Sequence, residues 1–190
     1  MARLKHTTRY QHAAVERLVD LDQLSASPAR YQRWLQRLYG LYAPLEDSLA
    51  QLPWTEVGLD FDARRKTALL VQDLTALGTC DEIQRTARCQ QLPTLTTLAQ
   101  GFGCLYVLEG ATLGGRIIAR RLSARLSVSA QHGGRFYHCY GPHGGTMWQH
   151  FGHAATAYAA THPECTHSIL DAACATFQCF EQWLGEWERE

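Results

Sequence analysis

The sequence lacks the features that mark nucleic-acid-binding and membrane-spanning proteins. Its 18 Lys and Arg balance 18 Asp and Glu, so the formal net charge is zero, and no run of like charges occurs. Nucleic acids and anionic membranes require a basic surface. No stretch approaches the roughly 20 apolar residues that span a bilayer, and the N-terminal residues include no apolar signal segment. We therefore expect a cytoplasmic protein that binds neither nucleic acid nor membrane.

The cysteines also lack a recognisable pattern. Their number is odd, seven, and no CxxC pair occurs, so neither a disulfide framework nor a zinc-finger spacing is present. We expect most of them to be small buried apolar residues in a reducing compartment. They are Cys80, Cys89, Cys104, Cys139, Cys165, Cys174 and Cys179.

The hydrophobic pattern is helical along nearly the whole chain. Apolar residues recur at three- and four-residue steps, and no segment has the alternation of a strand. Gly, His and Tyr dominate residues 128–145, which indicates a loop. With no linker or repeat, the sequence predicts one all-α domain over residues 1–190. The expected helices cover residues 4–19, 28–52, 62–77, 95–126, 146–161 and 164 to the C-terminus.

The helix expected over residues 95–126 contains an unusual number of glycines. Each interior glycine costs a helix roughly 0.5–1 kcal/mol relative to alanine, so something should compensate. Glycine lets a helix bend, and it lets a flat ligand or another backbone approach closely. Helix-on-helix packing is the simpler explanation, and the sequence leaves both open. The glycines are Gly101, Gly103, Gly110, Gly114 and Gly115.

His12 is a candidate metal ligand on the first expected helix. It shares an apolar face with Leu4, Thr8 and Val15, where a histidine is commonly an ordinary core residue. Glu16 follows one turn later. A metal-bound imidazole needs its second ring nitrogen anchored, often by a carboxylate, and this spacing supplies one.

Three segments together resemble the heme oxygenase family. Residues 4–12 with Glu16 resemble the proximal helix, and residues 106–115, ending in Gly-Gly, resemble the kinked distal helix. The aromatic residues of 136–151 resemble the segment that follows. The resemblance covers about residues 4–160, and the version here is similar to a bacterial branch associated with bacteriophytochromes.

This resemblance implies an all-α bundle that holds heme between the N-terminal proximal helix and the glycine-kinked distal helix, with His12 as the ligand of the heme iron. Heme would be both cofactor and substrate. Its oxidative cleavage with O₂ gives biliverdin, CO and ferrous iron. The electrons would come from a ferredoxin or a flavoprotein reductase, because the chain has no flavin or nicotinamide motif. A bacteriophytochrome is the implied acceptor of biliverdin.

The resemblance also assigns residues around the heme. Gly110, Gly114 and Gly115 would form the distal wall, with Thr112 as a further catalytic candidate. Lys5, seven residues before His12, occupies the position of a propionate ligand. The remaining expected heme-binding residues are Glu16, Tyr106, Gln149 and His153.

One departure from the family pattern concerns proton delivery. The mammalian-type distal helix has an aspartate at the position that Ala111 occupies here. Glu109 is close in sequence, but it lies on a different side of an ideal helix from Gly110 and is not expected to replace that aspartate. This departure favours an alternative, a heme- or bilin-binding protein without turnover on the same scaffold.

Two other hypotheses rest on surface residues. His150 and His153 lie three residues apart, with His138 and His143 nearby, but no carboxylate pattern completes a non-heme metal site. Arg116, Arg120, Arg121 and Arg125 form a local basic group, which we interpret as a docking patch for the electron donor.

Overall fold

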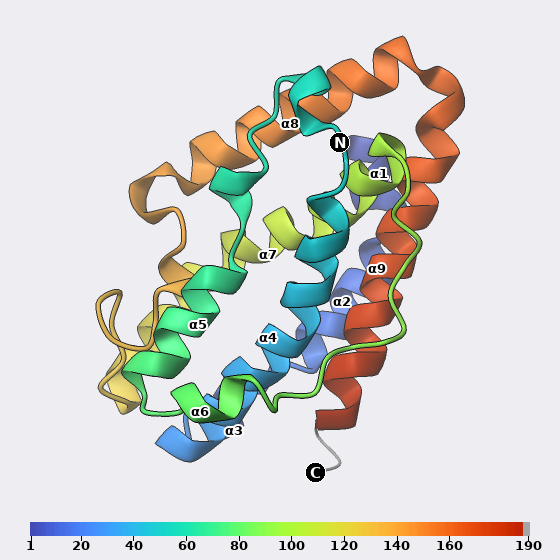
Figure 1. The fold of residues 1–190 in the computed structure, drawn as a ribbon. Helices are drawn as coiled ribbons and strands as arrows, with labels where there is room; N and C mark the ends of the chain where they lie inside the picture. The colour runs from blue at the N-terminus through green and yellow to red at the C-terminus, as the bar shows by residue number, and fades with distance from the viewer. Residues whose placement is uncertain (188–190) are drawn as a thin grey trace.

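The computed structural model describes residues 1–187, apart from the side chains of Cys80 and Glu186. These residues form helices joined by turns (Figure 1), with isolated β-bridges from Ser129 to His132 and Gly133 as the only strand-like pairing among them. The prediction of an all-α fold is confirmed. The α-helices are α1 (Ala2–Thr7), α2 (Arg9–Arg17), α3 (Leu21–Leu24), α4 (Pro28–Leu49), α5 (Thr67–Ala76), α6 (Cys80–Ile83), α7 (Leu98–Arg125), α8 (Gly144–Thr161) and α9 (Thr166–Trp187).

Helices α7 and α9 form the centre of the fold. Helix α7 begins at a capping box, in which Thr97 and Gln100 satisfy each other's backbone N–H groups. Its first half, Phe102 to Glu109, is buried. It packs closely on α9 at Gly103, where an added Cβ would lie 2.3 Å from the carbonyl oxygen of Ile169. A glycine is therefore required at this helix crossing.

Helix α4 supplies the other large part of the core. Ser27 caps it by accepting the N–H of Arg30, and Pro28 occupies the first turn, as the sequence predicts. Its aromatic residues make long-range contacts. The Trp34 indole N–H donates to the Tyr137 hydroxyl at 2.7 Å, and thus ties α4 to the segment that precedes α8.

The N-terminal helix is divided, which the sequence did not predict. Helices α1 and α2 meet at Thr8, whose buried hydroxyl donates to the carbonyl oxygen of Leu4 at 2.8 Å. Both helices pack against α9, which descends on the right of Figure 1. Helices α2 and α7 therefore lie on the same supporting helix.

Several other boundaries differ from the expected ones. Residues 62–64 form a 3₁₀ turn, so the third predicted helix begins only at Thr67; it ends before Gly78 (φ 83°), as expected. The segment expected as a loop contains 3₁₀ turns at Phe136–His138 and Gly141–His143. Helices α3 and α6 are single turns that the hydrophobic period does not reveal.

Helix α7 qualifies the expectation that no segment could cross a bilayer. Among the described residues it is the one helix long and apolar enough to do so by length and composition. Half of its most apolar stretch is buried inside the fold, as expected for the core helix of a globular protein.

Candidate active site

The first part of the site is an anchored histidine on α2. His12 Nδ1 lies 3.3 Å from Glu16 Oε2, and the two side chains are 51% and 69% exposed. The carboxylate holds Nδ1, so Nε2 is the nitrogen left for a metal. Phe177 of α9 meets the His12 ring edge-on, with centroids 5.8 Å apart. The imidazole is thus positioned from two sides, yet open to a ligand.

The second part is an open face on α7. An added Cβ at Gly110 or Gly114 would meet nothing within 4 Å. Leu113 and Ile117 lie on the same face by helical spacing, and they are 51% and 68% exposed, although large exposed apolar side chains are rare in this fold. This face combines missing side chains with apolar ones, and both properties suit a flat apolar ligand.

The five glycines of α7 therefore serve two different purposes. Gly101, Gly103 and Gly115 are packing glycines, because an added Cβ would meet Leu52, Ile169 or Tyr137 at 2.4, 2.3 and 2.8 Å respectively. Gly115 is buried against the backbone of Tyr137, unlike Gly110 and Gly114, and its expected place in the distal wall stays a prediction. Gly110 and Gly114 form the open part. The helix remains unbroken from Leu98 to Arg125, so the predicted kink does not interrupt it.

The polar residues near Gly110 face away from this open face. The Thr112 hydroxyl donates to the Glu109 carbonyl oxygen at 2.7 Å, and its side chain lines a recess on another side of α7. The expected catalytic position of Thr112 is therefore not supported by its placement. Ala111 is exposed and supplies no acid.

Glu109 belongs to a buried charge cluster that sequence reasoning missed. Its carboxylate lies 2.7 Å from Arg64 Nη1 and 2.9 Å from Lys66 Nζ, and it accepts the Tyr140 hydroxyl at 2.6 Å. Burial and the Glu109 carboxylate raise the pKa of Tyr140 well above its usual value. Both cations and the carboxylate are almost fully buried, which accords with the expectation that Glu109 does not face Gly110. No local pattern in the sequence indicates this cluster, because Glu109 lies 45 and 43 residues from Arg64 and Lys66 and 31 residues from Tyr140.

Tyr106 lies one turn before Gly110 and is the expected heme-binding residue at that end of the open face. Its ring packs on Trp148 of α8, with centroids 5.8 Å apart. Burial raises the pKa of Tyr106, and a hydrogen bond with the Thr8 side chain partly offsets that effect. Tyr106 thereby connects α7 to the junction of α1 and α2.

The expected propionate ligands lie on two elements. Lys5 is exposed in the last turn of α1, while Gln149 and His153 are exposed on α8. The two helices are adjacent, because Gly152 of α8 contacts the Met1 side chain, with its added Cβ 3.5 Å from Met1 Cγ. The structure therefore brings the segments of these three residues to one end of the molecule.

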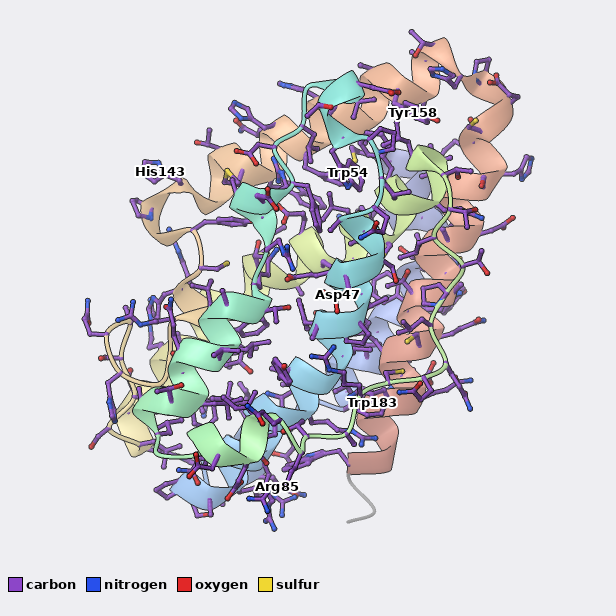
Figure 2. The ribbon with its side chains drawn as sticks, viewed as in Figure 1. Asp47, Trp54, Arg85, His143, Tyr158 and Trp183 are labelled. Atoms are coloured by element: carbon purple, nitrogen blue, oxygen red, sulfur yellow. The ribbon has the colours of Figure 1, made fainter. Side chains whose placement is uncertain are left out.

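The non-heme metal hypothesis finds no support in the described part of the chain, which contains no group of three His, Cys, Asp or Glu side chains able to hold a metal ion. Figure 2 shows His143 at the start of α8, on the side of the molecule away from α9. Where their side chains are described, the cysteines are free thiols. Cys89, Cys104 and Cys179 are buried, whereas Cys139, Cys165 and Cys174 are partly exposed, so half of them and not most are buried.

Comparison with known proteins identifies the family. The family model described as heme oxygenase matches residues 1–186. The chain belongs to the heme oxygenase family. A heme oxygenase from Xanthomonas campestris pv. campestris (strain 8004) is 36% identical over 95 residues, half of this chain and 54% of that relative. The match thus spans about half the length of the curated relative.

A solved structure has the same fold. The NO- and CO-bound heme oxygenase of Neisseria meningitidis superposes with a TM-score of 0.81, covering 97% of this chain and 89% of that one, at 21% sequence identity. The resemblance in fold therefore extends over nearly the whole chain. It confirms the predicted architecture of this family.

Proposed function

We propose that this protein cleaves heme oxidatively to biliverdin, CO and ferrous iron, with His12 as the iron ligand. The observation that carries the proposal is the pairing of an anchored, half-exposed histidine on α2 with the open glycine face of α7, both supported by α9. When bound, the heme iron would activate O₂ with electrons from an external donor. The residues present fit this group.

The protein's own contribution is positioning. Glu16 holds His12 Nδ1, which would leave Nε2 as the ligand of the heme iron. Gly110 and Gly114 would allow the backbone of α7 to approach the opposite side of a flat ligand, and Leu113 and Ile117 would supply apolar contact there. Lys5, Gln149 and His153 would bind the propionates as hydrogen-bond donors.

Proton supply has to differ from the mammalian-type pattern. Among the described residues, the face of Gly110 and Gly114 carries no carboxylate close to these glycines, and Glu109 is held by Arg64 and Lys66. We propose that water reaching the exposed side of Gly114 brings the protons.

The test is an anaerobic heme titration followed by addition of a reductant and oxygen. Wild type should bind one heme with a histidine-ligated Soret band, and His12→Ala should lose that band. His6→Ala is the matched control, because His6 is an exposed histidine of α1. Biliverdin should then form in wild type and in the control.

Two other outcomes would change the proposal. Stable heme binding without biliverdin under a competent reductant would reject turnover and leave the heme- or bilin-binding alternative. Absence of heme binding would reject both functions.

We also propose that the electron donor docks on the exposed arginines of α7. Arg125 pairs with Asp22 at 2.8 Å, and Arg116 donates to the Gly141 carbonyl oxygen at 2.6 Å. Arg120 and Arg121 are exposed, and their guanidinium groups have no partner among the described residues, so they are the stronger candidates to meet an acidic ferredoxin or flavoprotein reductase. Charge reversal at Arg121 should slow turnover with the donor protein and spare turnover driven by a small reductant; equal loss in both assays would reject docking there.

A bacteriophytochrome as acceptor of biliverdin stays a prediction from the resemblance.

A further inference from the structure

A recess lies beside α7, separate from the open face that carries Gly110 and Gly114. It has a volume of about 530 Å³, is open to solvent on one side, and is lined by α7 and the turns between Tyr137 and Gly144. Its α7 wall comes from residues 112, 116, 119, 120 and 123, whereas Gly110 and Gly114 do not line it. Residues important for its chemistry are Arg116, Arg120, His138, Tyr140 and Pro142. The volume falls within the range of small-molecule sites, roughly 300–1,000 Å³.

The lining of this recess is cationic. Arg116 and Arg120 are one helical turn apart on one wall, His138 lies on the other, and no Asp or Glu is among the lining residues. The Arg116 guanidinium is oriented by its hydrogen bond to the Gly141 carbonyl oxygen. That of Arg120 makes no hydrogen bond or ion pair with the described residues. One cation is thus positioned in advance, and the other is available to a ligand.

The buried charges behind the recess are already compensated. Lys66 lies 5.2 Å from the centroid of the Tyr140 ring, but its ammonium group is paired with Glu109. Tyr140 also directs its hydroxyl to Glu109, so its ring rather than its hydroxyl is available to a ligand. The uncompensated positive charge around the recess therefore comes from the arginines.

We propose that this recess binds a small planar organic dicarboxylate, and that its occupation weakens heme binding. Two arginines at i and i+4 lie on one face of a helix, with Cβ atoms about 5–6 Å apart, so their flexible side chains can bring two guanidinium groups to the two carboxylates of one small ligand. The Tyr140 ring and Pro142 give a flat, largely apolar side for the ring of the ligand. A phosphate ion would fill little of the volume and would leave this apolar side unused.

The coupling to heme rests on the proposed function and on Gly115. The segment that lines the recess packs against α7 at this residue, where an added Cβ would lie 2.8 Å from the Tyr137 carbonyl oxygen. Packed contacts of this kind transmit displacement instead of absorbing it. A ligand held between the segment and α7 would press the helix toward the face that carries Gly110 and Gly114.

Binding is tested first on the apoprotein, by calorimetry with isophthalate (benzene-1,3-dicarboxylate) as the probe. Isophthalate should bind with 1:1 stoichiometry, and Arg120→Gln should weaken it roughly tenfold or more, since hydrogen bonds to charged groups contribute about 1.5–3 kcal/mol. Arg121→Gln is the matched control, because the adjacent arginine does not line the recess. The uncharged isophthalamide should not bind, and inorganic phosphate should bind more weakly.

Three results would overturn the proposed site: no isophthalate binding at millimolar concentration, equal loss in the Arg120→Gln and Arg121→Gln variants, or phosphate binding as tightly as isophthalate. His12→Ala should bind isophthalate like wild type. Loss of binding in that variant would place the ligand at the heme site instead, which also overturns the proposal. None of these measurements requires heme.

Coupling is tested by heme titration with and without saturating isophthalate. Allosteric couplings typically change affinity about 5–150-fold. We expect weaker heme binding in wild type and in Arg121→Gln and, at the same isophthalate concentration, a clearly smaller change in Arg120→Gln, whose recess is only partly occupied. Unchanged heme affinity in wild type would reject the coupling, while the apoprotein result would still decide the site.

Discussion

The two kinds of glycine in α7 make opposite predictions for the same substitution. At Gly110 a Cβ would enter open space, so Gly110→Ala should raise the free energy of unfolding of the apoprotein by about 0.5–1 kcal/mol through helix propensity. At Gly115 a Cβ would meet the backbone oxygen of Tyr137 at 2.8 Å, and a backbone cannot rotate away. Gly115→Ala should therefore cost about 1–3 kcal/mol, the usual range for overpacking.

Heme binding should separate from stability at Gly110. The added methyl group stabilises the helix, but it occupies the face against which the heme lies in our proposal, so affinity and turnover should fall. Gly185→Ala is the matched control: Gly185 also has nothing within 4 Å of its added Cβ, yet it lies near the C-terminal end of α9. It should raise stability similarly and leave heme binding unchanged.

The assays are urea unfolding of the apoproteins and heme titration of the same variants. For a chain of this size, 1 kcal/mol corresponds to about 2–4 °C in Tm, so thermal unfolding can resolve the difference between Gly110→Ala and Gly115→Ala. Equal stability of those two variants would refute the packing argument. If Gly110→Ala binds heme as tightly as Gly185→Ala, the distal wall is not at Gly110.

Three further predictions concern charge and protonation. Glu109→Leu should destabilise the fold by about 3–5 kcal/mol in urea unfolding, because it leaves buried cations unpaired. As a control, Arg88→Gln at an exposed ion pair should cost less than about 1 kcal/mol. Similar costs for the two variants would show that the buried cluster tolerates loss of its anion. Glu16→Gln should weaken heme binding about 10–100-fold, as is usual for the partner of a ligating histidine, and an unchanged titration would refute its anchoring role. Burial raises the pKa of Tyr137, so this tyrosine stays protonated in the fold and ionises in the unfolded chain above about pH 10. The free energy of unfolding should therefore decline as pH rises beyond that value. Tyrosinate absorbance that fully precedes the loss of helical circular dichroism would contradict this prediction.

Much of the fold could be predicted because it depends on local signals. The cap at Ser27, the apolar period of α4 and the positive φ at Gly78 are set by residues within a few positions of each other. The division of the first helix at Thr8 was missed, since the residues on both sides continue one helical period. What separates α1 from α2 is burial of Thr8 at the junction, next to Tyr106 of α7.

The candidate site was predicted only in part. His12 and Glu16 are an i, i+4 pair, so their geometry follows from the helix alone. Leu113 and Ile117 could have been found by the same reasoning, as the residues three and seven positions after Gly110. The Arg64–Glu109–Lys66 cluster could not have been found by this reasoning, because it depends on how the segment of Arg64 and Lys66 packs on α7.

The sequence by itself determined the helical class, the family and the pairing of His12 with Glu16, because short-range periodicity and motif order encode them. The tertiary structure decided which glycines of α7 pack and which lie open, since a missing side chain has meaning only relative to its neighbours. Gly114 and Gly115 are adjacent in sequence, yet one faces open space and the other the backbone of Tyr137. One helical position rotates a residue by about 100°, and the surrounding elements determine what it then meets.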